Sequence, residues 1–184
     1  MIKKEISRRE VEEKIAGMGD FVKMHFLNGC LKRQIDFDTR RFVLLKLGEL
    51  YEERRMFLEA GKMIANAAPI NPIEKGKVAD LMKATEMLIK GGNFDDADIT
   101  FDRAAAYCTE QQKWEIKQKR IELFKKQADE YIKKDKRQNA LDAYEKLLSF
   151  NLTQDERKDA QKTLLDLYSK LGRIREYYNL RSTI

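Results

Sequence analysis

The sequence predicts an all-helical protein in which pairs of helices repeat along the chain. Charged residues make up 37% and hydrophobic residues 42% of its 184 residues, whereas glycine occurs 9 times and proline 2 times. The most abundant residues are strong helix formers, and β-branched residues do not cluster. Helix-start motifs recur along the chain, and the apolar residues between them follow the spacing of helix faces.

The helix starts are marked by side chains that can cap the first backbone amides. Ser7, Thr109 and Thr153 are each followed three residues later by Glu or Gln, which is the pattern of a capping box. Asn71 and Pro72 predict a further start, with Asn71 as the cap and Pro72 in the first turn. These starts and the apolar spacing predict about ten helices, at residues 8–17, 20–34, 40–53, 57–68, 73–90, 94–108, 110–133, 137–149, 154–170 and 173–181.

Apolar residues recur at helical spacing within these segments. Leu44, Leu47 and Tyr51 form one packing face. A second face is predicted within residues 110–133, made up of Trp114, Ile121, Phe124, Ala128 and Tyr131. No segment alternates with period two for long enough to form a strand. Because the connections are short, we expect consecutive helices to pack as antiparallel hairpins.

A small residue, a large residue four positions later and a small or apolar residue three positions after that recur three times. The copies are Ala60, Ile64 and Ala67; Ala97, Phe101 and Ala104; and Ala140, Tyr144 and Leu147. We expect these residues to form the packing face of the second helix in each pair, because the small residue lets a neighbouring helix approach closely.

Residues 41–74 carry a longer motif that includes the first of these copies. It consists of a large residue, a Leu-Gly pair, a tyrosine, a turn aromatic, the small-large-small pattern and a proline, at Leu44, Leu47, Gly48, Tyr51, Phe57, Ala60, Ile64, Ala67 and Pro72. This motif resembles the tetratricopeptide repeat, a helix-turn-helix unit of about 34 residues. The resemblance implies a right-handed α-solenoid built from antiparallel helix hairpins.

The resemblance covers almost the whole chain and predicts a single domain over residues 1–184. Further copies are predicted at 78–111 and 121–154, with a degenerate copy at 5–38 and a partial repeat or cap at 158–184. The copies that start at residues 41, 78, 121 and 158 lie 37, 43 and 37 residues apart. We expect the additional residues to lengthen the first helices, above all the helix after Thr109, and to bend that helix or make it protrude around residues 109–120.

The sequence lacks the patterns of an active site, a cofactor site or a metal site, so we expect no catalysis, no cofactor and no bound metal. His25 is the 1 histidine of the chain, and it has no cysteine or carboxylate at ligand spacing. Cys30 and Cys108 fit reduced thiols on helices. The first five residues are not followed by the apolar stretch of a signal peptide, and no apolar run reaches the roughly 20 residues of a membrane span. We therefore expect a cytoplasmic protein without a membrane partner.

The resemblance also implies a partner-binding groove lined by fixed positions of each first helix. Carried over, these positions are Phe42, Leu45, Glu49, Glu52, Met82, Glu86, Ile89, Asp129 and Asp166. The complete set of groove positions, which includes Asp159, holds seven carboxylates and two lysines. We therefore expect an adaptor or scaffold whose groove binds a protein or peptide partner, such as a basic peptide or an amphipathic helix.

An alternative function is RNA or ribosome association through a basic outer surface. The formal net charge is +6, and residues 113–137 carry ten basic and five acidic residues. Phosphate contacts are predicted at Lys117, Arg120, Lys126, Lys133 and Lys134. The apolar register of Trp114 argues against its stacking on bases.

A second alternative is homo-oligomerisation through the C-terminal helix. The last predicted helix carries Ile174, Tyr177, Tyr178 and Leu180, with no following repeat to cover them. Such a helix can pair with a second copy or act as a self-folding cap.

Leucine at Ala60 or Ala97 should overpack the helix pairs and lower the free energy of unfolding by about 1–3 kcal/mol. Thermal melts of the two variants test this expectation. An unchanged melting temperature in both would contradict the repeat register.

Overall fold

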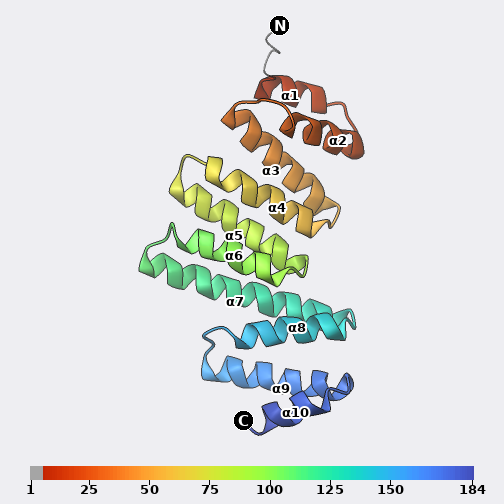
Figure 1. The fold of residues 1–184 in the computed structure, drawn as a ribbon, viewed down its shortest axis with the longest axis vertical. Coiled ribbons are helices and arrows are strands. Elements are labelled where there is room, and N and C mark those ends of the chain that lie inside the picture. The colour runs from red at the N-terminus through yellow and green to blue at the C-terminus, as the bar shows by residue number, and fades with distance from the viewer. Residues whose placement is uncertain (1–5) are drawn as a thin grey trace. The chain divides into compact units, whose positions relative to one another are not determined.

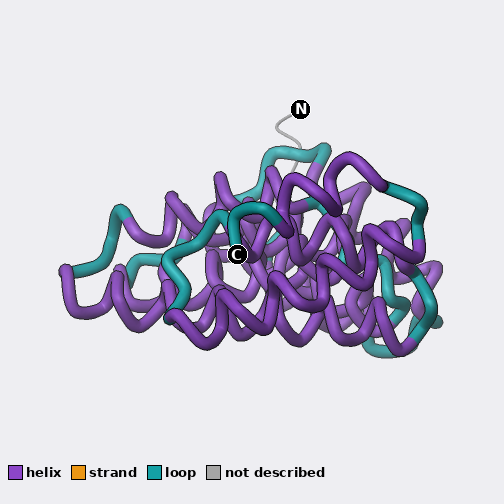
Figure 2. The backbone as a smooth tube through the Cα atoms, turned by 90° about the horizontal axis from the view of Figure 1, so that it is seen from below, coloured by secondary structure: helices purple, strands orange, loops and turns teal. Residues whose placement is uncertain are grey.

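The computed structural model describes residues 6–184, and every regular element in this range is a helix. These residues form ten α-helices and one short 3-10 helix, without a strand (Figure 1, Figure 2). The predicted all-α class is confirmed. The degenerate copy at 5–38 begins at Glu5, which lies outside the described residues. The first five residues, on which the expectation about a signal peptide depends, also lie outside them. No described helix has both the length and the apolar character needed to cross a membrane.

The chain divides into two compact units, Met1–Gln112 and Lys113–Ile184. Unit 1 contains α1 (Arg8–Ile15), α2 (Asp20–Leu31), α3 (Phe37–Glu53), α4 (Phe57–Ala67), the 3-10 helix η1 (Ala68–Ile70), α5 (Glu74–Lys90) and α6 (Phe94–Ala105). Unit 2 contains most of α7 (Glu110–Lys133), followed by α8 (Arg137–Leu148), α9 (Gln154–Lys170) and α10 (Ile174–Arg181). The single domain over residues 1–184 stays a prediction.

Each predicted copy of the repeat contains one pair of helices. The copies at 41–74, 78–111 and 121–154 correspond to α3 with α4, α5 with α6 and α7 with α8. The partial repeat or cap at 158–184 corresponds to α9 with α10, and the degenerate copy at 5–38 to α1 with α2. The first helices α3, α5 and α9 each have 17 residues, whereas α7 has 24. The expected lengthening of the helix after Thr109 is therefore confirmed. Its capping box also forms, because Thr109 and Gln112 exchange hydrogen bonds of 2.9 and 3.4 Å.

The turns inside the four clear helix pairs share one conformation. Each has a single residue with positive φ at its centre. The four residues are Arg55 (59°), Gly92 (75°), Asp135 (52°) and Gly172 (68°). The residue after each one donates its backbone amide to a carbonyl five residues earlier, at 2.9, 3.0, 2.9 and 2.8 Å, as in the Schellman motif that ends many helices. These turns lie 37, 43 and 37 residues apart, which are the spacings of the predicted copies.

The turn between α1 and α2 differs, because no other described residue has positive φ. Gly17 and Gly19 lie in this turn, where a glycine can adopt left-handed geometry without cost, but neither does so. The first helix pair is thus degenerate in its turn as well as in its sequence motif.

The residues predicted to pack the second helices are buried. Ala60, Ala97 and Ala140 are 0% exposed, and the large residues four positions later are buried as well. In unit 1, Gly48 of α3 lies so close to α4 that a Cβ built on it would be 2.7 Å from Cγ1 of Ile64. In Figure 1, α3, α4, α5 and α6 lie next to one another in chain order, and each contacts the next. Small residues therefore set the approach of these helices.

Asn71 and Pro72 do not start α5 as predicted. The N-cap residue is Ile73, and Asn71 makes no cap hydrogen bond to the helix. The buried Asn71 side chain accepts a hydrogen bond from the Ile73 amide at 3.2 Å and donates one to Asp80 at 2.9 Å. Asp80 is also paired with Arg41 of α3 at 2.8 Å. The local pattern was misread because Asn71 serves a tertiary polar network that links α3 to α5.

In the recurring turn, introducing a glycine and removing one should change the free energy of unfolding in opposite directions. A residue with a Cβ in left-handed geometry costs about 1–2 kcal/mol, so Asp135→Gly should raise the free energy of unfolding and Gly172→Ala should lower it, each by about 1 kcal/mol. Urea unfolding measures both.

Gly29→Ala is the matched control for these glycine changes, because Gly29 lies within α2 without positive φ and a Cβ there would meet nothing within 4 Å. It should stabilise the chain by about 0.5–1 kcal/mol. A Gly172→Ala variant with an unchanged free energy of unfolding would contradict the role assigned to the turn.

Candidate partner-binding surfaces

The predicted groove positions of unit 1 lie on α3 and α5, and two of them are inaccessible. Met82 is 4% and Ile89 is 1% exposed, so the groove prediction does not hold for these residues. The physical reason is that α5 packs against both α4 and α6 and buries residues on several of its faces. Phe42 and Leu45 are half-buried, and the guanidinium of Arg8 lies 5.0 Å from the centre of the Phe42 ring.

The three predicted groove carboxylates of unit 1 are neutralised by lysines. Lys46 lies 2.7 Å from Glu49, Lys83 lies 2.8 Å from Glu52, and Lys90 lies 2.6 Å from Glu86. The Lys83 pair joins α5 to α3, so sequence neighbours alone could not reveal it. These ion pairs remove the negative charge that was expected to attract a basic partner to this part of the chain.

Unit 2 contains a cavity of about 200 Å³ lined by residues of α7, α8 and α9. Its lining residues are Lys125, Asp129, Tyr144, Leu147, Glu156, Asp159, Ala160 and Thr163. The predicted groove residue Asp129 lies here, and so does Asp159 from the complete groove set. Asp166 does not line the cavity, and it forms an ion pair of 2.6 Å with Lys170 on its own helix.

The residues that line this cavity carry an excess of negative charge. Tyr144 donates its hydroxyl to Asp129 at 2.9 Å, and burial together with this bond raises the pKa of Tyr144 to about 12. Lys125 pairs with Glu156 and, with hydrogen bonds from Thr153, lowers the pKa of Glu156 to about 2. Within the described residues, no ion pair engages Asp129 or Asp159. The cavity therefore keeps two uncompensated carboxylates.

The interior of the cavity is apolar. Leu147 is 1%, Ala160 3% and Tyr144 8% exposed, so the floor beneath the carboxylates consists of an aliphatic side chain, a methyl group and an aromatic ring. In the described part of the chain, no three histidine, cysteine, aspartate or glutamate side chains are placed to hold a metal ion. The arrangement suits an organic cation with an apolar stem.

Sequence reasoning missed Tyr144, Glu156 and Thr163 as members of this site, whereas Lys125 is one of the two lysines in the complete set of predicted groove positions. Part of the signal was present, since Glu156 and Thr163 share one face of α9 with Asp159. Tyr144 had been assigned to packing alone. Only the packing of α7, α8 and α9 brings these side chains together.

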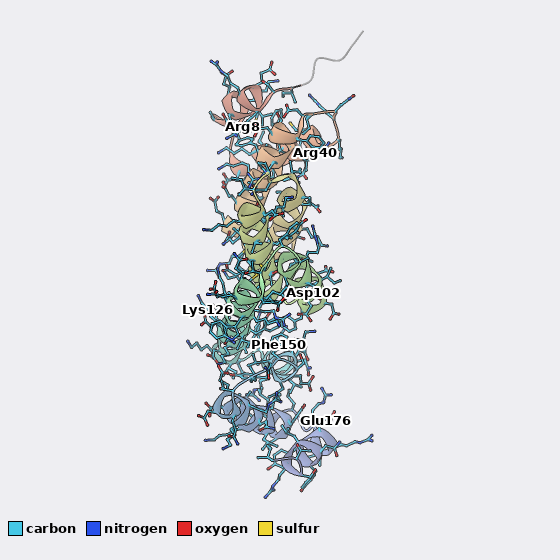
Figure 3. All side chains as sticks on the ribbon, turned by 90° about the vertical axis from the view of Figure 1, so that its left-hand side faces the viewer. Arg8, Arg40, Asp102, Lys126, Phe150 and Glu176 are labelled. Atoms are coloured by element: carbon cyan, nitrogen blue, oxygen red, sulfur yellow. The ribbon has the colours of Figure 1, made fainter. Side chains whose placement is uncertain are left out.

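Two of the five residues predicted for the basic surface contact other side chains of unit 2. The guanidinium of Arg120 lies 4.2 Å from the centre of the Phe150 ring, and Lys134 is paired with Glu130 at 3.2 Å. Lys117, Lys126 and Lys133 are exposed, and none forms an ion pair with another described residue (Figure 3 labels Lys126). Three of the five predicted phosphate contacts thus remain available.

Trp114 departs from the packing face predicted for it. Its side chain is 64% exposed, and the buried residues of α7 begin only at Ile121. The extra length of α7 explains the difference, because the first turns of this helix extend beyond the segment that packs. The expected bend in this helix stays a prediction.

Comparison with known proteins does not assign this chain to a family. No protein-family model, curated protein or solved structure matches the chain.

The Lys125–Glu156 pair predicts a pH-dependent contribution to stability. Because the pKa of Glu156 is lowered from 4.5 to about 2, its contribution is present above pH 4.5 and is lost as the pH falls towards 2. Glu156→Gln keeps a capping side chain but removes the charge. We expect it to lower the free energy of unfolding at pH 7 by up to about 1 kcal/mol, and the difference from wild type to shrink below pH 4.5.

Urea unfolding at about pH 7, 5, 4 and 3, which spans the titration of Glu156, measures this difference. Asp166→Asn is the control, because it removes an exposed ion pair within one helix and should change stability by only a few tenths of a kcal/mol. A Glu156→Gln difference that does not vary with pH would contradict the assignment.

Proposed function

We propose that this chain is a tetratricopeptide-like adaptor, a right-handed solenoid of antiparallel helix hairpins that binds a protein or peptide and catalyses no reaction. The observation that carries this proposal is the open, acidic cavity of unit 2, which includes Asp129 and Asp159 at positions where the family places its groove. Unit 1 contributes less to binding than its sequence suggests, because its groove carboxylates are paired with lysines.

Two features of the fold support the relationship to tetratricopeptide repeats. The same turn recurs at Arg55, Gly92, Asp135 and Gly172, and a fully buried alanine follows three of these turns, at Ala60, Ala97 and Ala140. Both features follow the spacing of the predicted copies. The first helix α7, at 24 residues, is longer than half of a unit of about 34 residues.

The proposal includes a cytoplasmic location. Neither Cys30 nor Cys108 forms a disulfide, and burial raises the pKa of Cys30. Cysteines that form no disulfide fit a reducing compartment.

RNA association is the second candidate, and the exposure of Trp114 favours it. An aromatic side chain that is 64% exposed on the same helix as the unpaired Lys117 provides a surface for base stacking beside a phosphate contact. Lys126 and Lys133 are two turns apart on one face of α7 and add two further phosphate contacts.

Charge reversal separates the two candidates. The full chain is immobilised and exposed to a lysate of its source organism with and without nuclease. We expect a discrete protein to be retained after nuclease, and Asp129→Lys combined with Asp159→Lys to reduce its retention about tenfold or more, because the reversed charges repel a basic partner. Lys126→Glu combined with Lys133→Glu is the matched control and should leave retention unchanged.

Two other outcomes would redirect the proposal. Loss of all retained material with nuclease or with the lysine reversals would establish the RNA alternative. Retention of the chain itself, abolished by Ile174→Ser with Tyr178→Ser, would establish homo-oligomerisation, because these side chains are 60% and 62% exposed on α10.

A further inference from the structure

The size of the unit 2 cavity restricts what can occupy it. Its volume of about 200 Å³ is below the roughly 300–1,000 Å³ of cavities that enclose a small-molecule ligand. It is nevertheless several times the roughly 30 Å³ that one water molecule occupies in the liquid. The cavity therefore has room for one long side chain of a partner.

The charge of the cavity selects a cationic side chain. Asp129 and Asp159 reach it from α7 and α9, and neither has an ion-pair partner among the described residues. The single lysine of the lining, Lys125, is already engaged by Glu156. The Tyr144 hydroxyl donates its hydrogen bond to Oδ1 of Asp129, so the second oxygen of this carboxylate stays available as an acceptor.

The shape and chemistry of the lining favour arginine over lysine. A guanidinium is planar and offers several N–H donors, so it can donate hydrogen bonds to carboxylates on two helices at once. An ammonium acts as a point charge. Tyr144, Leu147 and Ala160 line the cavity and can cover the methylene stem.

We propose that the unit 2 cavity is a receptor for an arginine side chain presented by the bound partner. This inference rests on the proposed function and specifies the chemistry that its site recognises. The partner is thereby a protein with an exposed arginine that enters between α7, α8 and α9, and not a peptide that binds by net basic charge alone.

Amide chemical shifts of the ¹⁵N-labelled full chain test this inference, with N-acetyl-arginine N-methylamide as the probe. We expect concentration-dependent shifts confined to residues around Asp129, Tyr144, Asp159 and Thr163. The citrulline analogue has the same shape without the charge and should cause none. Asp159→Asn and Asp129→Asn should each weaken the arginine response about fivefold or more, which corresponds to one lost charge-assisted contact.

Asp166→Asn is the matched control, since Asp166 is an acidic residue of the same helix that lies outside the cavity lining. Unchanged spectra of the variants away from the site show that they are folded. Equal shifts with citrulline, shifts spread over the carboxylates of both units, or an equal effect of Asp166→Asn would overturn the inference.

The inference and the proposed function fail in different ways. If arginine shifts the cavity residues but the Asp129→Lys and Asp159→Lys chain still retains its protein partner, the cavity is an arginine site and the proposed binding surface is wrong. If the reversed chain loses its partner while arginine causes no shifts, the binding surface stands and the arginine inference is overturned.

Discussion

Four times within residues 6–184 a helix ends in a turn with one left-handed residue, and the arrangement of helix pairs depends on this turn. The turn hydrogen-bonds the last carbonyls of the first helix, which would otherwise lack partners, and it lets the second helix begin two residues after the left-handed position. Gly92 and Gly172 adopt this geometry easily, whereas Arg55 and Asp135 adopt it despite their side chains. The geometry persists without the preferred residue, so the packing that follows the turn stabilises it.

That packing depends on small residues at the points of closest approach. Ala60, Ala97 and Ala140 lie within four to five residues after their turns and are completely buried, and Gly48 leaves space for Ile64. Close backbone approach directs the large side chains inward and leaves long charged side chains on the surface. Ion pairs then form between helices as well as within them, as in the Lys83–Glu52 pair between α5 and α3. A surface that is rich in carboxylates can therefore be electrically neutral.

Net charge is a poor guide to the binding surface of this protein for the same reason. The chain carries a formal charge of +6, but the cavity of unit 2 retains two unpaired carboxylates. Lys125 and Lys126 are adjacent in sequence and have different environments, because Lys125 pairs with Glu156 in the cavity lining and Lys126 is exposed. Local geometry at each side chain, rather than the sum over the molecule, decides which partner chemistry the surface attracts.

The sequence by itself determined the helices, their capping boxes, the turn positions and the buried alanines, because each depends on residues within one or two turns of one another. It also pointed to Asp129 as a site residue. Only the tertiary structure decided that Met82 and Ile89 are buried, that Asn71 joins a polar network, that Arg120 packs on Phe150, and that Tyr144 and Asp159 meet Asp129 around one cavity. These facts depend on contacts between helices, and helical periodicity specifies which face of a helix is apolar but not which side chain of another helix faces it.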